Sequence, residues 1–190
     1  MTSAEAGPEA GPAARPAARI LVAGIGNIFL SDDGFGVETV RRLAAERLPE
    51  HVDTVDTGVR GVHLAYQLLE GYDLVVLVDA SARGGVPGTV YLIEAGEQGA
   101  TEPDAALLDG HRMTPDSVLA LLDTLCAGTG GTAPRRTLVV GCEPATVEEG
   151  IGLSRPVADA VPEAVRLILR LVGDPEAAMH TATATHTATR

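Results

Sequence analysis

The sequence predicts a single domain with a three-layer α/β/α sandwich fold, in which helices flank a mostly parallel central sheet of about five strands. Short apolar segments that stop at glycine or aspartate alternate along the chain with longer segments whose apolar residues recur three or four positions apart. The short segments are typical of strands buried on both faces, and the longer spacing is typical of amphipathic helices. A length of 190 residues is also usual for one domain.

The first half of the domain alternates strictly between the two kinds of segment. We expect strands at residues 19–24, 52–57 and 73–79, and helices at residues 34–48 and 61–70. The third of these strands reads DLVVLVD and is the most apolar. It is therefore expected at the centre of the sheet, covered on both faces.

The second half continues the alternation after a glycine-rich turn. Strands are expected at residues 89–94 and 137–141, and the last helix at residues 154–172. Another helix is expected to begin at Thr114, because threonine can cap a helix and the proline that follows it suits the first turn. Residues 96–110 are polar and contain glycine, so they predict a loop long enough to carry function.

The two ends of the chain depart from this pattern. Residues 1–17 are dominated by alanine, proline, glycine and glutamate, and residues 177–190 are largely threonine and alanine. Such segments cannot bury enough apolar surface to offset the entropy of ordering, so we expect a disordered N-terminal extension and a disordered tail. The α/β domain is then expected at residues 18–176.

The composition excludes several classes of function. The chain has 14 basic and 26 acidic residues, a net charge of −12, and every basic residue is arginine. The acidic balance argues against nucleic acid as a partner, and the absence of lysine excludes a Walker-type phosphate loop and Schiff-base chemistry. No apolar segment is long enough to span a bilayer, and the N-terminus lacks a secretory signal pattern. We therefore expect a cytoplasmic protein with no membrane partner.

Acidic and imidazole side chains occur where an α/β sheet binds ligands, beyond the carboxyl ends of its strands. Asp32 and Asp33 follow the first expected strand, Asp79 ends the central strand, and His111 precedes the helix at Thr114. Two carboxylates and an imidazole could hold a divalent metal ion with open coordination positions. Each acid also has a structural explanation, because one of the pair can cap a helix and Asp79 can accept hydrogen bonds from backbone amides.

Two other kinds of site match the sequence less completely. Gly24 and Gly26 fit the first two positions of the dinucleotide-binding pattern G-x-G-x-x-G, but Phe29 occupies the third. The two aspartates that follow would also repel a pyrophosphate. Cys142 lies at a strand end and is a candidate nucleophile, although buried packing is the more usual role for such a cysteine. A nucleotide-binding α/β enzyme therefore stays an alternative.

Five segments match the motifs of a known family in order and in spacing. The segments are ILVAGIGNIFLSDDGFGVETVRRL, DTGVRGVHLAYQLL, LVVLVDA, GHRMTPDSVLALL and GCEPATVEEGIGLSRPVADAVPEAV. Thr57 and Val59 depart from the family pattern in the second segment. Over about residues 18–172, the chain resembles the [NiFe]-hydrogenase maturation endopeptidases.

The resemblance implies an endopeptidase that removes the C-terminal extension of a nickel-loaded [NiFe]-hydrogenase large-subunit precursor. It also implies that Asp33, Asp79 and His111 are the catalytic residues and metal ligands, which would contact the nickel held by the substrate. Another divalent metal is possible, and Asp32 is the alternative to Asp33. Two mechanisms remain open: a metal that polarises the scissile carbonyl or activates water, and an acid that acts as general base, as in an aspartic-type endopeptidase.

The residues around these ligands are candidates for binding the substrate peptide. Glycine allows close approach of another backbone, although tight turns would explain the same glycines equally well. The candidates are Gly24, Gly26, Asn27, Asp32, Gly58 and Gly61. The resemblance also leaves an alternative function, a non-catalytic checkpoint protein that binds the large subunit and senses its nickel without cutting it.

Overall fold

The computed structural model describes residues 18–95, 114–180 and 184–186. The strands are β1 (Ile20–Ile25), β2 (Val52–Gly58), β3 (Leu74–Ala80), β4 (Val90–Glu94), β5 (Arg136–Cys142) and β6 (Ala184–His186). The helices are a 3₁₀ turn (Ser31–Gly34), α1 (Phe35–Leu43), α2 (Gly61–Leu68), α3 (Pro115–Thr129), α4 (Arg155–Gly173) and α5 (Pro175–Ala178). Every strand and helix expected between residues 19 and 172 is present. The helix expected at residues 34–48 ends earlier, because the residues directly after Leu43 are exposed and have no core to pack against.

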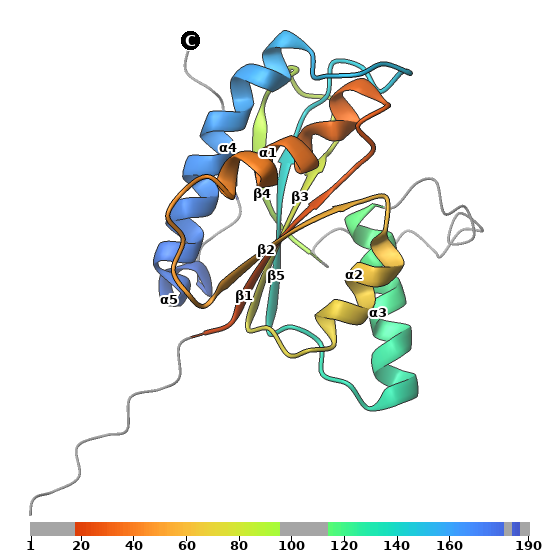
Figure 1. Ribbon diagram of the computed structural model, residues 1–190, viewed down its shortest axis with the longest axis vertical. Coiled ribbons are helices and arrows are strands. Elements are labelled where there is room, and N and C mark those ends of the chain that lie inside the picture. Colours follow the sequence, from red (N-terminus) through yellow and green to blue (C-terminus); the bar gives the residue numbers. More distant parts are fainter. Residues whose placement is uncertain (1–17, 96–113, 181–183, 187–190) are drawn as a thin grey trace, which may run out of the picture.

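The strands form one sheet in the order β2-β1-β3-β5-β4-β6. Strands β2, β1, β3 and β5 run parallel to one another, whereas β4 is antiparallel to β5 and β6 is antiparallel to β4. Figure 1 shows α1 and α4 on one face of the sheet and α2 and α3 on the other. The predicted three-layer fold with a mostly parallel sheet is confirmed, and β3 lies in its interior between β1 and β5.

Each strand in the middle of the sheet contributes to two separate cores. Along β1, Ile20 and Val22 belong to the core beneath α1 and α4, whereas Leu21 and Ala23 belong to the core beneath α2 and α3. All four side chains are fully buried. This alternation is the physical reason why the strands read as continuous apolar segments.

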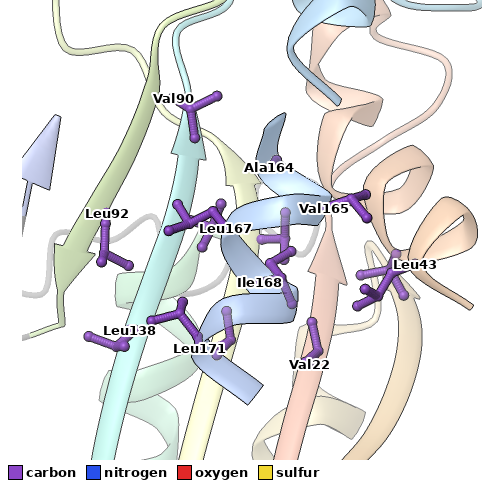
Figure 2. Packing of buried hydrophobic residues seen from close by; sticks show 14 of the residues in the cluster. Val22, Leu43, Val90, Leu92, Leu138, Ala164, Val165, Leu167, Ile168 and Leu171 are labelled. Atoms are coloured by element: carbon purple, nitrogen blue, oxygen red, sulfur yellow. The ribbon is translucent and has the colours of Figure 1, made fainter. Parts of the chain in front are cut away.

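Helix α4 supplies much of the first core. Figure 2 shows Leu167, Ile168 and Leu171 between the ribbon of α4 and the strands, and Val165 beside Leu43 of α1. Helices α1 and α4 therefore form one layer, and the spacing of apolar residues that predicted α4 corresponds to its buried face.

Helix α1 lies unusually close to the sheet. A Cβ atom on Gly36 would lie 2.1 Å from the carbonyl oxygen of Val78, and one on Gly24 would lie 2.4 Å from the carbonyl oxygen of Gly36. No larger residue fits at either position without moving the helix. This contact places the 3₁₀ turn, which carries the acidic pair, directly above the carboxyl ends of β1 and β3.

The end of the described chain adds two short elements. Helix α5 crosses the predicted domain boundary at residue 176, and β6 pairs with the outer edge of β4 through residues of the predicted tail. The domain boundaries themselves stay predictions. Within the described ranges, no helix is both long enough and apolar enough to cross a membrane.

Candidate functional site

The carboxyl ends of β1, β2 and β3 meet at one edge of the sheet, because these strands are parallel neighbours. The turns after β1 and β2 are joined directly, since the amide of Gly26 donates to the carbonyl oxygen of Gly58 at 3.1 Å. The turn after β1 leads into the 3₁₀ turn with Asp32 and Asp33, and Asp79 is the penultimate residue of β3. Three of the predicted polar residues therefore lie at the same edge.

Asp32 is fully buried, and both of its carboxylate oxygens accept hydrogen bonds. Oδ2 accepts from the amides of Ala145 (2.8 Å) and Thr146 (3.1 Å) and from the hydroxyl of Ser154 (2.8 Å), while Oδ1 accepts from the amide of Ser154 (2.6 Å). Burial alone would raise the pKa of Asp32, but these bonds outweigh it and hold the pKa below its ordinary value. Asp32 is thus an anchor for the loop before α4, and it does not cap the 3₁₀ turn.

Asp33 differs from its neighbour in exposure and in bonding. Its side chain is partly exposed, and Oδ2 accepts the amide of Asn27 at 2.6 Å. Among the described residues, Oδ1 has no hydrogen-bond donor. Gly26 has a φ of 127°, and a Cβ there would lie 1.8 Å from the carbonyl oxygen of Asp33. Glycine is therefore required at the position where the chain after β1 passes the 3₁₀ turn.

Asp79 is a buried carboxyl group with little compensation. Its residue is 7% exposed at the end of β3. Burial raises the pKa of Asp79 well above its ordinary value, and the negative charges of Asp33 and Asp116 raise it further, against one hydrogen bond from the amide of Ala80. A cation between the carboxylates would remove this repulsion, which is the arrangement expected of a site that meets a positive charge.

A pocket of about 450 Å³ opens beside Asp79. Its walls are the end of β3 and the following loop (residues 79–83), the end of β4 (residues 93–95) and the start of α3 (residues 114–116). His111 lies outside the described residues, three positions before Thr114 in the pocket wall. In the described ranges, no three His, Cys, Asp or Glu side chains are grouped so that they could hold a metal ion.

Two residues beside the pocket, Asp116 and Glu143, are not among the site residues predicted from the sequence. Asp116 lines the pocket and acts electrostatically on Asp79. An acid in the first turn of a helix already has an explanation in the helix dipole, so its sequence position gave no distinct signal. Glu143 follows β5 directly, and the strand-end position is the signal that could have found it.

Glu143 holds the loop that follows β3. It is 5% exposed and accepts the amides of Arg83 (2.8 Å) and Gly84 (3.1 Å) and the hydroxyl of Tyr91 (2.8 Å). Burial would raise the pKa of Glu143, but these donors outweigh it and lower the pKa. Burial of Tyr91 and its hydrogen bond to Glu143 raise the pKa of Tyr91 to about 12. Glu143 therefore fixes one wall of the pocket.

The remaining sequence candidates have structural roles in this arrangement. Cys142 is fully buried, and burial together with the charges of Asp32 and Glu143 raises the pKa of its thiol to about 12, so it lacks the thiolate that a nucleophile needs. Gly58 has a positive φ of 55°, and Gly61 begins α2 in a buried position. The substrate-binding role of the glycines and of Asn27 stays a prediction.

The chain is similar to known proteins of one family. A family model described as hydrogenase maturation protease matches residues 37–171. The hydrogenase expression/formation protein HupD of Rhizobium leguminosarum bv. viciae is 33% identical over 156 residues, which cover 81% of this chain and 74% of that protein. The hydrogenase 2 maturation protease of Escherichia coli is 29% identical over 153 residues, which cover 80% of this chain and 88% of that protein.

A solved structure supports the same conclusion. The hydrogenase maturating endopeptidase HybD from E. coli matches with a TM-score of 0.64 and 26% identity, covering 90% of this chain and 98% of that one. The match therefore extends over both layers of helices and the sheet between them. The chain belongs to the hydrogenase maturation protease family, as its sequence motifs predict, and it is a peptidase.

Proposed function

We propose that this protein removes the C-terminal extension of a nickel-loaded [NiFe]-hydrogenase large-subunit precursor, and that Asp33, Asp79 and His111 contact the nickel carried by that substrate. The observation that supports the proposal most is the state of Asp79. A carboxyl group that is 7% exposed and faces the like charges of Asp33 and Asp116 is costly to the folded protein. A substrate that brings a divalent cation would relieve this cost, and a substrate without the cation would not.

The donor set of the site suits nickel in the substrate. Imidazole is a common ligand for nickel, and carboxylates bind many divalent cations, so another divalent metal would also fit these groups. Asp33 is the better ligand of the acidic pair, because Asp32 already has its oxygens engaged by Ala145, Thr146 and Ser154. We therefore assign the nickel contact to Asp33 rather than to Asp32.

The same geometry supports an acid–base role for one carboxyl group. Burial raises the pKa of Asp79 above its ordinary value, which makes this carboxyl group a better proton acceptor than an ordinary aspartate, and general acid–base catalysis of peptide hydrolysis needs such a group. We propose that Asp79 activates the attacking water once the substrate is bound. In this mechanism the nickel acts in recognition, and the carboxyl chemistry is of the aspartic type.

The test uses precursor with and without nickel. Wild-type protein is incubated with each form, and the mass of the large subunit is read by mass spectrometry. We expect a loss of mass for the nickel-loaded form only. His111→Ala is expected to abolish the cleavage, and His63→Ala, which changes an exposed histidine on α2, is the matched control and should cleave as the wild type does.

Three outcomes would contradict the proposal. Equal cleavage of both precursor forms would remove nickel from recognition. Full activity of His111→Ala would remove the imidazole from the site. A stable complex with nickel-loaded precursor and no change in mass would favour a checkpoint protein that senses nickel without cutting.

A further inference from the structure

Two loops beside the site are bonded into one unit, which we call the two-loop platform (residues 27–34 and 144–154). Leu30 and Gly150 form an isolated parallel bridge. The amide of Ser31 donates to the carbonyl oxygen of Gly150 at 3.0 Å, and the amide of Gly150 donates to the carbonyl oxygen of Phe29 at 2.9 Å. The buried Asp32 ties the same loops together from below. The platform is therefore held in one shape before any partner binds.

This platform displays large apolar side chains to solvent. Phe29 in the first loop is 61% exposed, and Ile151 in the second loop is 85% exposed. Phe29 accepts the amide of Gly150, and Ile151 is the next residue along the chain. Val147, in the second loop, is 50% exposed. Single exposed apolar residues are common, but several on one preorganised surface are typical of a protein interaction site.

The platform lies at the carboxyl edge of the sheet, where Asp33 and Asp79 also lie (Figure 1). The amide of Phe29 donates to Oδ1 of Asn27 at 3.0 Å, and the amide of Asn27 donates to the carboxylate of Asp33 at 2.6 Å. Phe29 is therefore linked to Asp33 through Asn27, so the platform and the proposed ligand belong to the same short segment.

The charge of the platform indicates the chemistry of its partner. Glu148 and Glu149 are exposed between Val147 and Ile151. The chain as a whole carries a net charge of −12, so an acidic protein surface would be repelled. A complementary surface is apolar at its centre and basic at its border.

We infer that the two-loop platform docks the folded body of the large-subunit precursor, with Phe29 and Ile151 inserted into an apolar surface that basic side chains surround. This inference rests on the proposed function. It adds that recognition extends beyond the nickel and the cleaved segment. The platform is a binding surface and takes no part in the chemistry, so its loss should weaken binding and leave the rate at saturation unchanged.

The experiment measures binding and turnover with a nickel-loaded precursor. Phe29→Ser/Ile151→Ser is compared with Tyr66→Ser, which removes an aromatic side chain that is 56% exposed on α2. We expect Kd and KM to rise about tenfold or more in the double variant, with kcat within about twofold of the wild type. Glu148→Gln/Glu149→Gln should bind more weakly at low salt and should show a smaller dependence of Kd on salt.

The outcomes separate this inference from the proposed function. Absence of cleavage by the wild type would overturn the proposed function, and the Kd values would still decide whether the platform binds the precursor. Cleavage by the wild type with an unchanged Kd and KM in the double variant would overturn the docking surface alone. An equal loss in Tyr66→Ser would do the same. If circular dichroism shows that the double variant is unfolded, Ile151→Ser alone is used, because that side chain is 85% exposed.

Discussion

Asp32 and Asp79 are both buried aspartates at the carboxyl edge of the sheet, yet their surroundings are opposite. Asp32 accepts four hydrogen bonds within 3.1 Å, and its pKa is lowered. Asp79 has one backbone donor, faces Asp33 and Asp116, and its pKa is raised. The carboxylate of Asp32 thus has all its interactions within the folded protein, whereas the carboxyl group of Asp79 is buried without enough partners.

The difference teaches how to separate scaffold from site among residues of one type. A buried charge that the fold satisfies contributes to stability, and a buried charge that the fold leaves unsatisfied is retained at a cost. Such a cost is typical of functional sites, where the compensating interaction arrives with the substrate. Substitutions at the two aspartates should therefore affect activity and stability in opposite proportions.

The largest effect is expected for Asp79→Asn. The amide keeps the shape of the side chain but cannot act as a base or a charged ligand, so processing of the precursor should fall by about 100-fold or more. The same change removes a buried acid that faces two others, so the melting temperature should rise by a few degrees. Mass spectrometry of the precursor and thermal unfolding of the isolated protein measure the two effects.

The gain in stability from Asp79→Asn should depend on pH with a defined sign. The pKa of Asp79 in the folded protein lies above its ordinary value of 3.8. As pH rises from 3.8 through the folded-state pKa, the unfolded chain loses this proton while the folded protein keeps it, so the wild type loses stability relative to the variant. Below pH 3.8 the advantage of the variant should disappear. An advantage that is constant with pH, or a loss of stability at neutral pH, would contradict this account of Asp79.

The next effect is a loss of stability in Asp32→Ala. The change leaves three amides and a hydroxyl without their acceptor and empties the buried position of the carboxylate, so we expect the free energy of unfolding to fall by about 3 kcal/mol. Chemical denaturation measures it. Because the pKa of Asp32 is lowered, its contribution is present above its ordinary value of 3.8 and is lost as pH falls through the folded-state pKa. The difference from the wild type should therefore shrink in acid.

Asp33→Ala is the matched control for that variant. Asp33 accepts one described amide and is partly exposed, so its removal should lower the free energy of unfolding by only about 1 kcal/mol. Processing should nevertheless be lost, because Asp33 is the proposed ligand. A larger loss of stability in Asp33→Ala than in Asp32→Ala would reverse the assignment of anchor and ligand.

The strands and helices could be predicted because their patterns are local. Residues 73–79 read as a buried central strand from their own side chains, and β3 is found there. The same logic predicted that polar side chains at the ends of β1 and β3 would meet. Strand β6 could not be predicted this way, because its few residues become a strand only through pairing with the edge of β4.

The sequence could not predict that Asp32 anchors a loop while Asp33 keeps a carboxylate oxygen free of donors among the described residues. The donors to Asp32 come from Ala145, Thr146 and Ser154, more than a hundred positions along the chain, and no local pattern announces them. Asp116 was not predicted for a similar reason, since it acts on Asp79 only once folding brings both residues to the same pocket. His111 lies outside the described residues, so its role rests on the resemblance and on the test above.

A smaller effect is expected at the wall of the pocket. Tyr91→Phe removes one of the donors to Glu143 and leaves the amides of Arg83 and Gly84 in place. The free energy of unfolding should fall by about 1 kcal/mol, and processing should stay within about threefold of the wild type. Glu143→Ala removes the acceptor instead and should cost more, because the amides then lose their partner. Equal costs would mean that Glu143 does not hold the loop.

The smallest effect concerns the two cysteines, which extend the contrast between satisfied and reactive groups to thiols. Cys142 is fully buried with a thiol pKa raised to about 12, whereas Cys126 is partly exposed on α3. Iodoacetamide should therefore label Cys126 and leave Cys142 unmodified in the native protein, as peptide mass mapping would show. Labelling should leave processing unchanged. Rapid labelling of Cys142 under native conditions would show that the region beside Asp32 and Glu143 opens to solvent. It would then contradict the interpretation that the hydrogen bonds of these two carboxylates hold the region rigid.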